Sequence, residues 1–352
     1  MRSSTKRANS YKILRIISKS VLVISIITAF CAFCFNTNYI NAFADGIAEC
    51  VMELSTGKII HSKSKKVRLP MASTTKIMTA LLVIEDCDLE EVITVPDAAV
   101  GTEGSSIYLK RGEKISVKDL LYGLMLRSGN DSAVALAIHH SGSTENFAKC
   151  MNERAKEIGA LSTNFKNPSG LPDPEHYTTA EDLCLIACTA MRNQTFKQVV
   201  STQNYTGEYR SYVNKNKMLK MVEGANGVKT GYTLKAGRCL VSSVEREGMD
   251  VVSVVLNCPD MYERSKILIE DAFKRYSLKE IDKNTVFMCG IVPCKIQNTC
   301  TFLVENDKIL DYKVNPLNEE DEKSNDGALG KLEIYCGNDL IFTQKLYSII
   351  NN

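Results

Sequence analysis

Apolar positions follow two different spacings along this chain, and the change from one to the other marks its predicted elements. Residues 47–61, IAECVMELSTGKIIH, predict two strands joined by a turn at Thr56-Gly57. Later stretches repeat their apolar residues every three or four positions, which predicts helices. These are IMTALLVIE (77–85), DLLYGLMLRS (119–128), NDSAVALAIHH (130–140) and ENFAKCMNERAKEIG (145–159). We therefore expect a strand hairpin followed by a helical section.

A segment rich in turn formers separates these helices from a second group of strands. The stretch NPSGLPDPEHYTTAEDL (167–183) favours a long ordered loop until Thr178 or Thr179 caps another helix. Three predicted strands follow within residues 227–257, and an amphipathic helix over residues 262–277 closes the section. Because strands flank the helices on both sides, we expect an α+β fold with one sheet assembled from distant segments.

The pattern changes again beyond about residue 280, where short strands surround the charged loop NEEDEKSNDG (318–327). This pattern predicts a small all-β domain. The last residues, IFTQKLYSIINN (341–352), alternate like a strand and do not predict an amphipathic membrane helix. No internal repeat is evident.

The beginning of the chain has the composition of a secretory signal. Residues 1–20 carry six basic residues and no acidic one, and residues 21–35 (VLVISIITAFCAFCF) are continuously apolar or small. This run of 15 residues is shorter than the roughly 20 that a membrane-spanning helix needs. Ala42-Phe43-Ala44 then offers a small-x-small cleavage site. We expect an exported protein, with an uncleaved membrane anchor as the alternative.

Three segments follow from these patterns. We expect a signal peptide over residues 1–44, a large α+β domain over 45–278 and a small β domain over 279–352. Without the first segment the formal charge falls from +2 to −4, because that segment contains six basic and no acidic residues. A mildly acidic chain has no electrostatic footprint for nucleic acid.

Cysteine and histidine usage limits the metal and disulfide chemistry. Two of the 13 cysteines lie in the signal segment, which leaves eleven, an odd number without any CxxC pair. Cys184 and Cys188 have i,i+4 spacing, but apolar neighbours favour buried thiols over metal ligands. One or two disulfides remain open among the C-terminal cysteines, which are Cys289, Cys294, Cys300 and Cys336. With only four histidines and no ligand cluster, we expect no metal and no cofactor.

Four Ser-x-x-Lys pairs occur in the chain, and one of them has a distinct setting. Three lie in polar or basic stretches: Ser3/Lys6, Ser55/Lys58 and Ser62/Lys65. The fourth, Ser73/Lys76 in PMASTTKIMTA, leads into an apolar helical run, where residues i and i+3 share a face. Taken alone, this pair is more typical of a helix cap followed by a solvated lysine than of a catalytic pair.

Two downstream motifs change that balance. Ser128-Gly129-Asn130 lies between two predicted helices, and Lys229-Thr230-Gly231 opens a predicted strand. Ser-x-x-Lys, a Ser-x-Asn motif and Lys-Thr-Gly form one set in the penicillin-binding proteins and class A β-lactamases, and they occur here in that order. Each motif is common by itself. Their joint occurrence, each on its expected element, indicates a catalytic site.

On these residues the chain resembles the serine D-alanyl-D-alanine carboxypeptidases, which are low-molecular-weight penicillin-binding proteins of the peptidase S11 type. The resemblance covers about residues 46–275 and includes PMASTTKIMTA, LMLRSGNDSAVALA, FKNPSGLPDPEHYTTAEDL and GVKTGYTLKAGRCLV. It implies a β-lactamase/transpeptidase-like α+β domain over 45–278, with an antiparallel sheet, flanking helices and a helical subdomain. It also implies removal of the terminal D-Ala from peptidoglycan pentapeptides and covalent binding of β-lactams.

The resemblance implies catalytic roles for the matching residues. Ser73 is the acylated nucleophile and Lys76 its general base, while Ser128 relays a proton to the leaving amine. Asn130 holds the substrate amide and the lysine side chain. A lysine with a pKa of about 10.4 is protonated at neutral pH, so Lys76 can act only if its pKa falls. Burial and the neighbouring charge of Lys229 would both lower it.

Substrate-binding roles are implied for the predicted strand. Lys229 and Thr230 bind the terminal carboxylate, and Gly231 keeps the edge of the sheet open to a ligand. The backbone N–H groups of Ser73 and Tyr232 form the oxyanion hole. We expect surface or structural roles, not catalysis, for His61, His139 and His140, and a loop-stabilising role for His176.

Two other functions remain open at this point. A class A β-lactamase adds a deacylating glutamate from an ExxLN loop, and no ExxLN occurs in this chain, so we expect slow antibiotic hydrolysis. A catalytically silent wall-binding protein on the same fold would not need the intact motif residues. The expected partners are peptidoglycan stem peptides ending in D-Ala-D-Ala and β-lactams as acylating inhibitors. We expect action outside the cytoplasm, in cell-wall synthesis and cell shape, and leave membrane or wall association open.

Overall fold

The computed structural model describes residues 46–317 and 327–349. The contacts within the chain join the residues from Gly46 onward into one compact unit. The expected signal peptide over residues 1–44 lies outside the described residues. Among the helices that the structure describes, none is long and apolar enough to cross a membrane.

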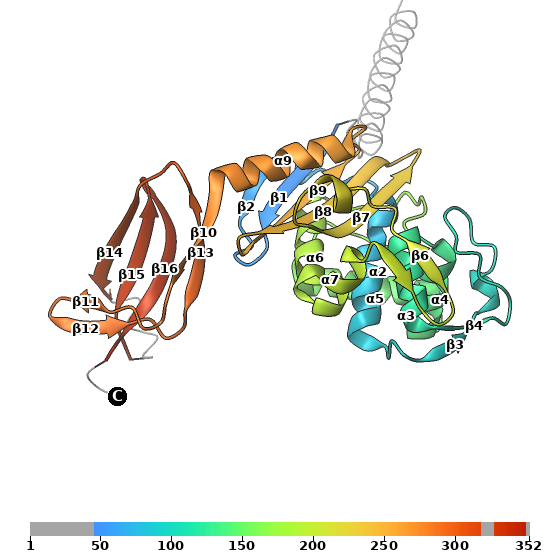
Figure 1. The fold of residues 1–352 in the computed structure, drawn as a ribbon, viewed down its shortest axis with the longest axis horizontal. Helices are drawn as coiled ribbons and strands as arrows, with labels where there is room; N and C mark the ends of the chain where they lie inside the picture. The colour runs from blue at the N-terminus through green and yellow to red at the C-terminus, as the bar shows by residue number, and fades with distance from the viewer. Residues whose placement is uncertain (1–45, 318–326, 350–352) are drawn as a thin grey trace, which may run out of the picture. The chain divides into compact units, whose positions relative to one another are not determined.

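A five-stranded antiparallel sheet forms the centre of the larger part (Figure 1). Its strand order is β2-β1-β9-β8-β7, so β1 and β9, the first and the last of these strands in the sequence, pair inside the sheet, and β2 and β7 are the edge strands. This arrangement confirms the expected α+β fold and the single sheet built from distant segments. The strands are β1 (Ala48–Glu53), β2 (Ile59–Lys63), β7 (Ala225–Thr233), β8 (Gly237–Arg246) and β9 (Met249–Leu256).

Alternate residues of each strand point to opposite sides of this sheet, and each side packs against its own apolar core. On one face, Val51 and Val251 pack with Leu268 and Ile269 of α9 (Met261–Arg275), the expected amphipathic helix. On the other face, Cys50, Met52 and Val252 join the larger core formed with the remaining helices. Figure 1 shows α9 on one side of the sheet and α2, α6 and α7 on the other.

The helical section follows the expected order, with one irregularity. A short 3-10 turn, η1 (Ala72–Thr75), leads into α2 (Lys76–Asp86), and a π-helical turn, η3 (Gly123–Arg127), extends α3 (Val117–Tyr122). The other helices are α4 (Asn130–Ser141), α5 (Thr144–Ile158), α6 (Ala180–Arg192), α7 (Gln194–Ser201) and α8 (Met218–Met221). Thr179 is the cap of α6, since its side chain accepts a hydrogen bond from the Asp182 N–H.

Two small hairpins lie among these helices. They pair β3 (Val92–Thr94) with β4 (Lys114–Ser116), and β5 (Asn204–Thr206) with β6 (Ser211–Val213). The loop between β3 and β4 and the loop over residues 159–179 both contribute residues to the pocket beside Ser73 that is described below.

The C-terminal section is all-β, as expected. One sheet has the order β11-β12-β16-β15-β14, and β10 pairs with β13 in a second. Ile296, Phe302 and Leu332 belong to a separate apolar core there. The expected boundary between residues 278 and 279 falls inside β10. The strands are β10 (Tyr276–Ile281), β11 (Phe287–Cys289), β12 (Val292–Lys295), β13 (Cys300–Glu305), β14 (Leu310–Pro316), β15 (Ala328–Cys336) and β16 (Asp339–Ser348).

All eleven cysteines of the described part are free thiols, including the four C-terminal ones for which disulfides had remained open. Cys184 and Cys188 are buried in the core, which agrees with their interpretation as apolar-type thiols. In the same part of the chain, no group of three or more His, Cys, Asp or Glu residues is arranged to hold a metal ion.

Candidate active site

Ser73 lies on the 3-10 turn η1, directly before the buried helix α2. The turn starts from Ala72, whose φ of 47° is in the left-handed region that non-glycine residues rarely adopt. The Lys76 Nζ atom lies 3.0 Å from the Ser73 Oγ atom. The two side chains that the i,i+3 spacing predicted to meet are therefore in hydrogen-bond contact.

The loop over residues 167–178 holds this turn from one side. Gly170 has a φ of +86°, and a Cβ atom there would lie 1.9 Å from the backbone oxygen of Ala72. Only glycine fits this position, because the two backbones approach so closely and because the φ is positive. The loop and the turn that presents Ser73 are consequently one packed unit.

His176 connects the same loop to the turn. Its Nδ1 atom accepts a hydrogen bond from the Lys166 N–H, so its Nε2 atom carries the proton and donates to Thr75 Oγ1 at 2.8 Å. Thr75 in turn donates to the Ala72 carbonyl. Burial lowers the pKa of His176 to about 4, which keeps the ring neutral. His176 thus has the loop-stabilising position that its sequence context predicted.

Lys76 is fully buried and has three oxygen neighbours. Besides Ser73 Oγ, its Nζ atom contacts Asn130 Oδ1 at 2.7 Å and the Ser169 carbonyl oxygen at 2.5 Å. The Asn130 amide orientation is fixed, because its Nδ2 atom donates to the Glu103 carbonyl, which can only accept. Asn130 Oδ1 is therefore the atom that faces the lysine.

These contacts determine where the lone pair of a neutral Lys76 points. A neutral amine has two N–H donors and one lone pair, and two of its three neighbours, Asn130 Oδ1 and the Ser169 carbonyl, can only accept. Both donors are used by these oxygens. The lone pair is left for the Ser73 hydroxyl, which is the geometry that proton transfer from serine to lysine requires.

The surroundings of Lys76 favour the neutral amine. Burial holds its pKa well below the ordinary value, the charge of Lys229 lowers it further, and Asp131 opposes both effects. The Asp131 carboxylate is already engaged, since it accepts hydrogen bonds from the Ile107 and Leu109 N–H groups. The sequence-based condition for Lys76, burial with a second cation nearby, is met by this geometry.

Lys229 is nearly as buried as Lys76, at 2% exposure, and its Nζ atom donates to the Thr230 carbonyl at 3.0 Å. Burial and the charge of Lys215 lower the pKa of Lys229 to about 7. Lys215 itself has a pKa below its ordinary value because of burial and of the neighbouring Arg127. Sequence reasoning had not selected Lys215, since no motif marks it.

The strand β7 forms the other wall of the site, at the open edge of the sheet. Lys229, Thr230, Gly231 and Tyr232 are consecutive on it, so the four expected substrate-binding residues share one element. A Cβ atom on Gly231 would lie 3.0 Å from the Ser73 backbone nitrogen. The glycine therefore allows the Ser73 N–H to lie against the strand.

Ser128-Gly129-Asn130 occupies the junction between η3 and α4, as the sequence predicted. Ser128 ends the π-helical turn in the left-handed conformation, with a φ of 64°, and is 8% exposed. Asn130 begins α4 and contacts Lys76. The structure thus brings Lys76 into direct contact with both Ser73 and Asn130, and places Ser128 two residues before Asn130.

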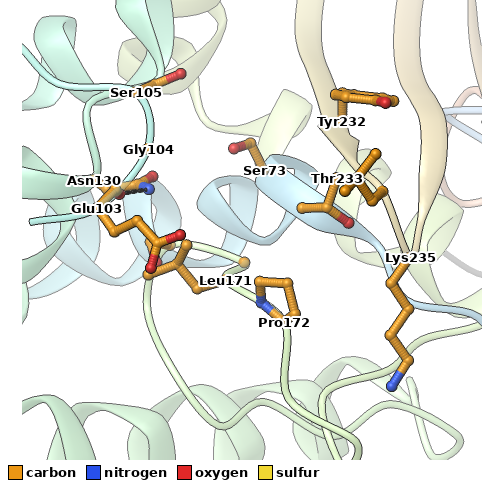
Figure 2. A pocket seen from close by; sticks show the side chains of 13 residues that line it. Ser73, Glu103, Gly104, Ser105, Asn130, Leu171, Pro172, Tyr232, Thr233 and Lys235 are labelled. Atoms are coloured by element: carbon orange, nitrogen blue, oxygen red, sulfur yellow. Dashed lines mark hydrogen bonds between the residues drawn. The ribbon is translucent and has the colours of Figure 1, made fainter.

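A pocket of about 360 Å³ opens beside Ser73 (Figure 2). Of the expected site residues, Ser73, Asn130 and Tyr232 line it, whereas Lys76, Ser128 and Lys229 are buried. The other lining residues were not selected from the sequence, because only the fold brings their loops together. They are Glu103, Gly104, Ser105, Ser169, Gly170, Leu171, Pro172, Thr233, Leu234 and Lys235.

The other Ser-x-x-Lys pairs have different settings. Ser55 donates to the Glu53 carboxylate, and Lys58 contacts the Ile341 carbonyl. Lys65 forms an ion pair with Glu181. Ser3/Lys6 lies outside the described residues. The surface histidines also have structural partners, in the pairs His61–Glu49, His139–Glu91 and His140–Asp86.

The family model and the relatives that match this chain all have the description D-alanyl-D-alanine carboxypeptidase. Residues 43–260 match the D-alanyl-D-alanine carboxypeptidase family, peptidase S11. D-alanyl-D-alanine carboxypeptidase DacF of Bacillus subtilis (strain 168) is 36% identical over 252 residues, covering 66% of this chain and 63% of that protein. The D-alanyl-D-alanine carboxypeptidase of Streptomyces sp. (strain K15) is 37% identical over 227 residues, covering 58% of this chain and 78% of that protein.

Solved structures of penicillin-binding proteins and of a DD-transpeptidase are also similar to this chain. Penicillin binding protein 5 from Haemophilus influenzae superimposes with a TM-score of 0.73 at 25% identity, over 86% of this chain and 95% of that one. A mutant of the Streptomyces K15 DD-transpeptidase superimposes with a TM-score of 0.60 at 33% identity, over 64% of this chain and 95% of that one. The family match spans more than half of the chain and includes the three motifs. The chain therefore belongs to the D-alanyl-D-alanine carboxypeptidase family, peptidase S11.

Proposed function

We propose that this protein is a serine D-alanyl-D-alanine carboxypeptidase that removes the terminal D-Ala from peptidoglycan pentapeptides. Ser73 forms the acyl-enzyme, and β-lactams acylate the same hydroxyl. The observation that carries the proposal is the 3.0 Å contact between Ser73 Oγ and a fully buried Lys76, whose two acceptor-only neighbours direct its lone pair to the serine. Family membership supports the choice of substrate.

The first step is attack of Ser73 Oγ on the carbonyl carbon of the penultimate D-Ala. Lys76 takes the hydroxyl proton, and the backbone N–H groups of Ser73 and Tyr232 stabilise the negative charge on the carbonyl oxygen. Removing one such donor costs about 100-fold or more in rate in other serine hydrolases. Lys229 and Thr230 bind the terminal carboxylate, with the charge of Lys215 nearby.

The second step breaks the peptide bond and releases D-Ala. The proton held by Lys76 returns to the leaving amine through Ser128, and Asn130 holds the substrate amide. Water then hydrolyses the ester bond to Ser73, with Lys76 again accepting a proton. The Streptomyces relative is described both as a carboxypeptidase and as a DD-transpeptidase, so an amine in place of water is the second acceptor to consider here.

We also propose that the protein is exported and acts at the peptidoglycan, outside the cytoplasm, in cell-wall synthesis and cell shape. The support is the basic and apolar composition of residues 1–44 and the substrate of the family. Residues 45–278 act as the catalytic domain, and residues 279–352 as a small β domain. The same proposal includes an association of the protein with the membrane or with the cell wall.

The test is D-Ala release from a diacetyl-L-lysyl-D-alanyl-D-alanine peptide. We expect release by the wild type, loss of release in Ser73→Ala, and normal release in Ser62→Ala. Ser62 is the matched control, because it belongs to another Ser-x-x-Lys pair and is exposed. D-Ala release that persists in Ser73→Ala would show that the nucleophile is another residue.

The same assay separates the alternatives. A silent wall-binding protein would release no D-Ala and would not be acylated by penicillin. A β-lactamase would turn over penicillin rapidly, whereas the lack of an ExxLN motif leads us to expect a persistent acyl-enzyme. Cleavage of cross-linked peptide dimers, measured in parallel, reports endopeptidase activity by the same residues.

A further inference from the structure

The pocket beside Ser73 contains a carboxylate that the proposed steps do not use. Glu103 comes from the loop between β3 and β4, and its backbone carbonyl accepts a hydrogen bond from Asn130 Nδ2. The backbone of Glu103 is thereby tied to the amide that contacts Lys76. Within residues 46–317 and 327–349, the Glu103 carboxylate itself has no hydrogen bond or ion pair.

The Glu103 side chain extends into the pocket. Figure 2 shows its carboxylate directed toward Leu171, on the side of the pocket opposite Tyr232 and Thr233. Among the described residues that line this pocket, Glu103 is the only acidic one. A negative charge therefore faces the space beside the nucleophile.

The proposed binding mode shows which part of a substrate meets this charge. The terminal carboxylate lies at Lys229 and Thr230, and the scissile carbonyl lies between Ser73 and the Tyr232 N–H. The peptide that precedes the scissile bond must then continue past Tyr232, along Thr233. This is the part of the site where the pocket opens, and Lys229 is absent from its lining.

We propose that Glu103 selects substrates in which the residue before D-Ala-D-Ala has an aliphatic side chain ending in a free ammonium group. Leu171 and Pro172 supply an apolar wall for the methylene groups, and the Glu103 carboxylate pairs with the ammonium. This inference rests on the proposed carboxypeptidase function and adds the chemical class of the acyl-side residue.

The expected effect is moderate, because the carboxylate is exposed before the ligand covers it. Exposed ion pairs contribute little, and pairs covered by a ligand contribute more, so we expect a preference of about threefold to tenfold in kcat/KM. Salt screens such a pair, so the preference must fall as the ionic strength rises. A purely structural role of Glu103 would not produce this salt dependence.

The experiment compares two peptides that differ only in acetylation of one lysine Nε atom, which removes its positive charge; the salt dependence of the ratio separates the effect of charge from that of the added acetyl group. Nα-acetyl-L-lysyl-D-alanyl-D-alanine has a free ammonium group, and Nα,Nε-diacetyl-L-lysyl-D-alanyl-D-alanine does not. The readout is the ratio of their kcat/KM values for D-Ala release. We expect a ratio above one in the wild type, a ratio near one in Glu103→Gln, and an intermediate ratio in Glu103→Asp, which keeps the charge.

Glu175→Gln is the matched control. Glu175 is an exposed glutamate of the neighbouring loop, paired with Lys166 and absent from the pocket lining, and its variant should keep the wild-type ratio. A wild-type ratio near one, or a raised ratio that persists in Glu103→Gln, would overturn the inference while leaving the proposed function intact. Release of D-Ala from neither peptide would instead overturn the proposed function, and this inference with it.

Discussion

At the scale of single residues, the proposed chemistry depends on three neighbouring lysines, Lys76, Lys229 and Lys215, whose like charges lower the pKa of Lys76 and of Lys229. Burial and Lys229 lower the pKa of Lys76, and burial and Lys215 lower the pKa of Lys229. Acylation needs a neutral Lys76, which is favoured as pH rises. Carboxylate binding needs a charged Lys229, which is lost as pH rises through about 7. The pH profile of kcat/KM should therefore be bell-shaped, with an alkaline limb near neutrality.

The alkaline limb should respond to Lys215. Lys215→Gln removes a positive charge that lowers the pKa of Lys229, so Lys229 should keep its proton to higher pH. Normalised to its own maximum, kcat/KM of the variant should be about threefold higher than the wild type on the alkaline side. The measurement is D-Ala release across a pH series. An alkaline limb that stays in place would exclude Lys229 as its origin.

The acid limb should respond to Asn130. Asn130→Asp places a carboxylate 2.7 Å from Lys76 Nζ, where it favours the charged amine and raises the pKa of Lys76. The limb should move to higher pH, and acylation at neutral pH should fall by about tenfold or more. Stopped-flow acylation by a chromogenic penicillin measures this directly. A variant with an unshifted acid limb would argue against Lys76 as the base.

These residues show what the sequence could and could not reveal. Motif order selected Ser73, Lys76, Asn130 and Lys229, because their chemistry requires fixed residue types at short spacings. Glu103 and Lys215 have no such signal. They reach the site through loops whose course depends on the packing of the whole domain, which one sequence does not specify.

At the scale of elements, the turn η1 and the loop over residues 167–178 determine where Ser73 lies. Periodicity predicted the buried helix α2, and the capping preference of threonine limited the cap of α6 to Thr178 or Thr179, of which the structure has Thr179. Periodicity could not predict the π-helical turn η3, or the close approach of Gly170 to Ala72. Both depend on contacts between segments far apart in the sequence.

Gly170→Ala tests this packing. The variant places a methyl group 1.9 Å from the Ala72 oxygen at a positive φ, so either the loop or the Ser73 turn must move. We expect penicillin acylation to fall at least tenfold, and the midpoint of urea unfolding to fall as well. Gly159→Ala is the control, because Gly159 has a similar φ of +92° but open space around it. It should lose about 1 kcal/mol of stability and keep its acylation rate.

At the scale of the whole molecule, the order of hydrophobic patterns was enough to predict the α+β sheet and the C-terminal strands. The expected boundary between residues 278 and 279 stays a prediction; β10 (Tyr276–Ile281) spans it and pairs with β13. Alternating patterns locate strands, but they do not reveal which partner a strand will choose. The pairing decides to which part of the molecule a strand belongs.

Truncation tests whether the catalytic part is self-sufficient. A chain that ends at Ser277 loses the contact of Leu303 with the core beneath α9, so its thermal stability should fall. The catalytic pocket keeps all of its lining residues, and D-Ala release should stay within about threefold of the full chain. A truncated chain that unfolds cooperatively but releases no D-Ala would show that the C-terminal strands contribute to catalysis.

The central claim, that Ser73 is the nucleophile of this family member, is tested most directly by mass spectrometry after reaction with benzylpenicillin. Intact mass gives the stoichiometry, and peptide mapping locates the modified residue. We predict one penicilloyl group per chain, on the peptide that contains Ser73, with slow loss over time and no labelling in Ser73→Ala. An adduct on any other residue, or no adduct on the folded wild-type protein, would contradict the account.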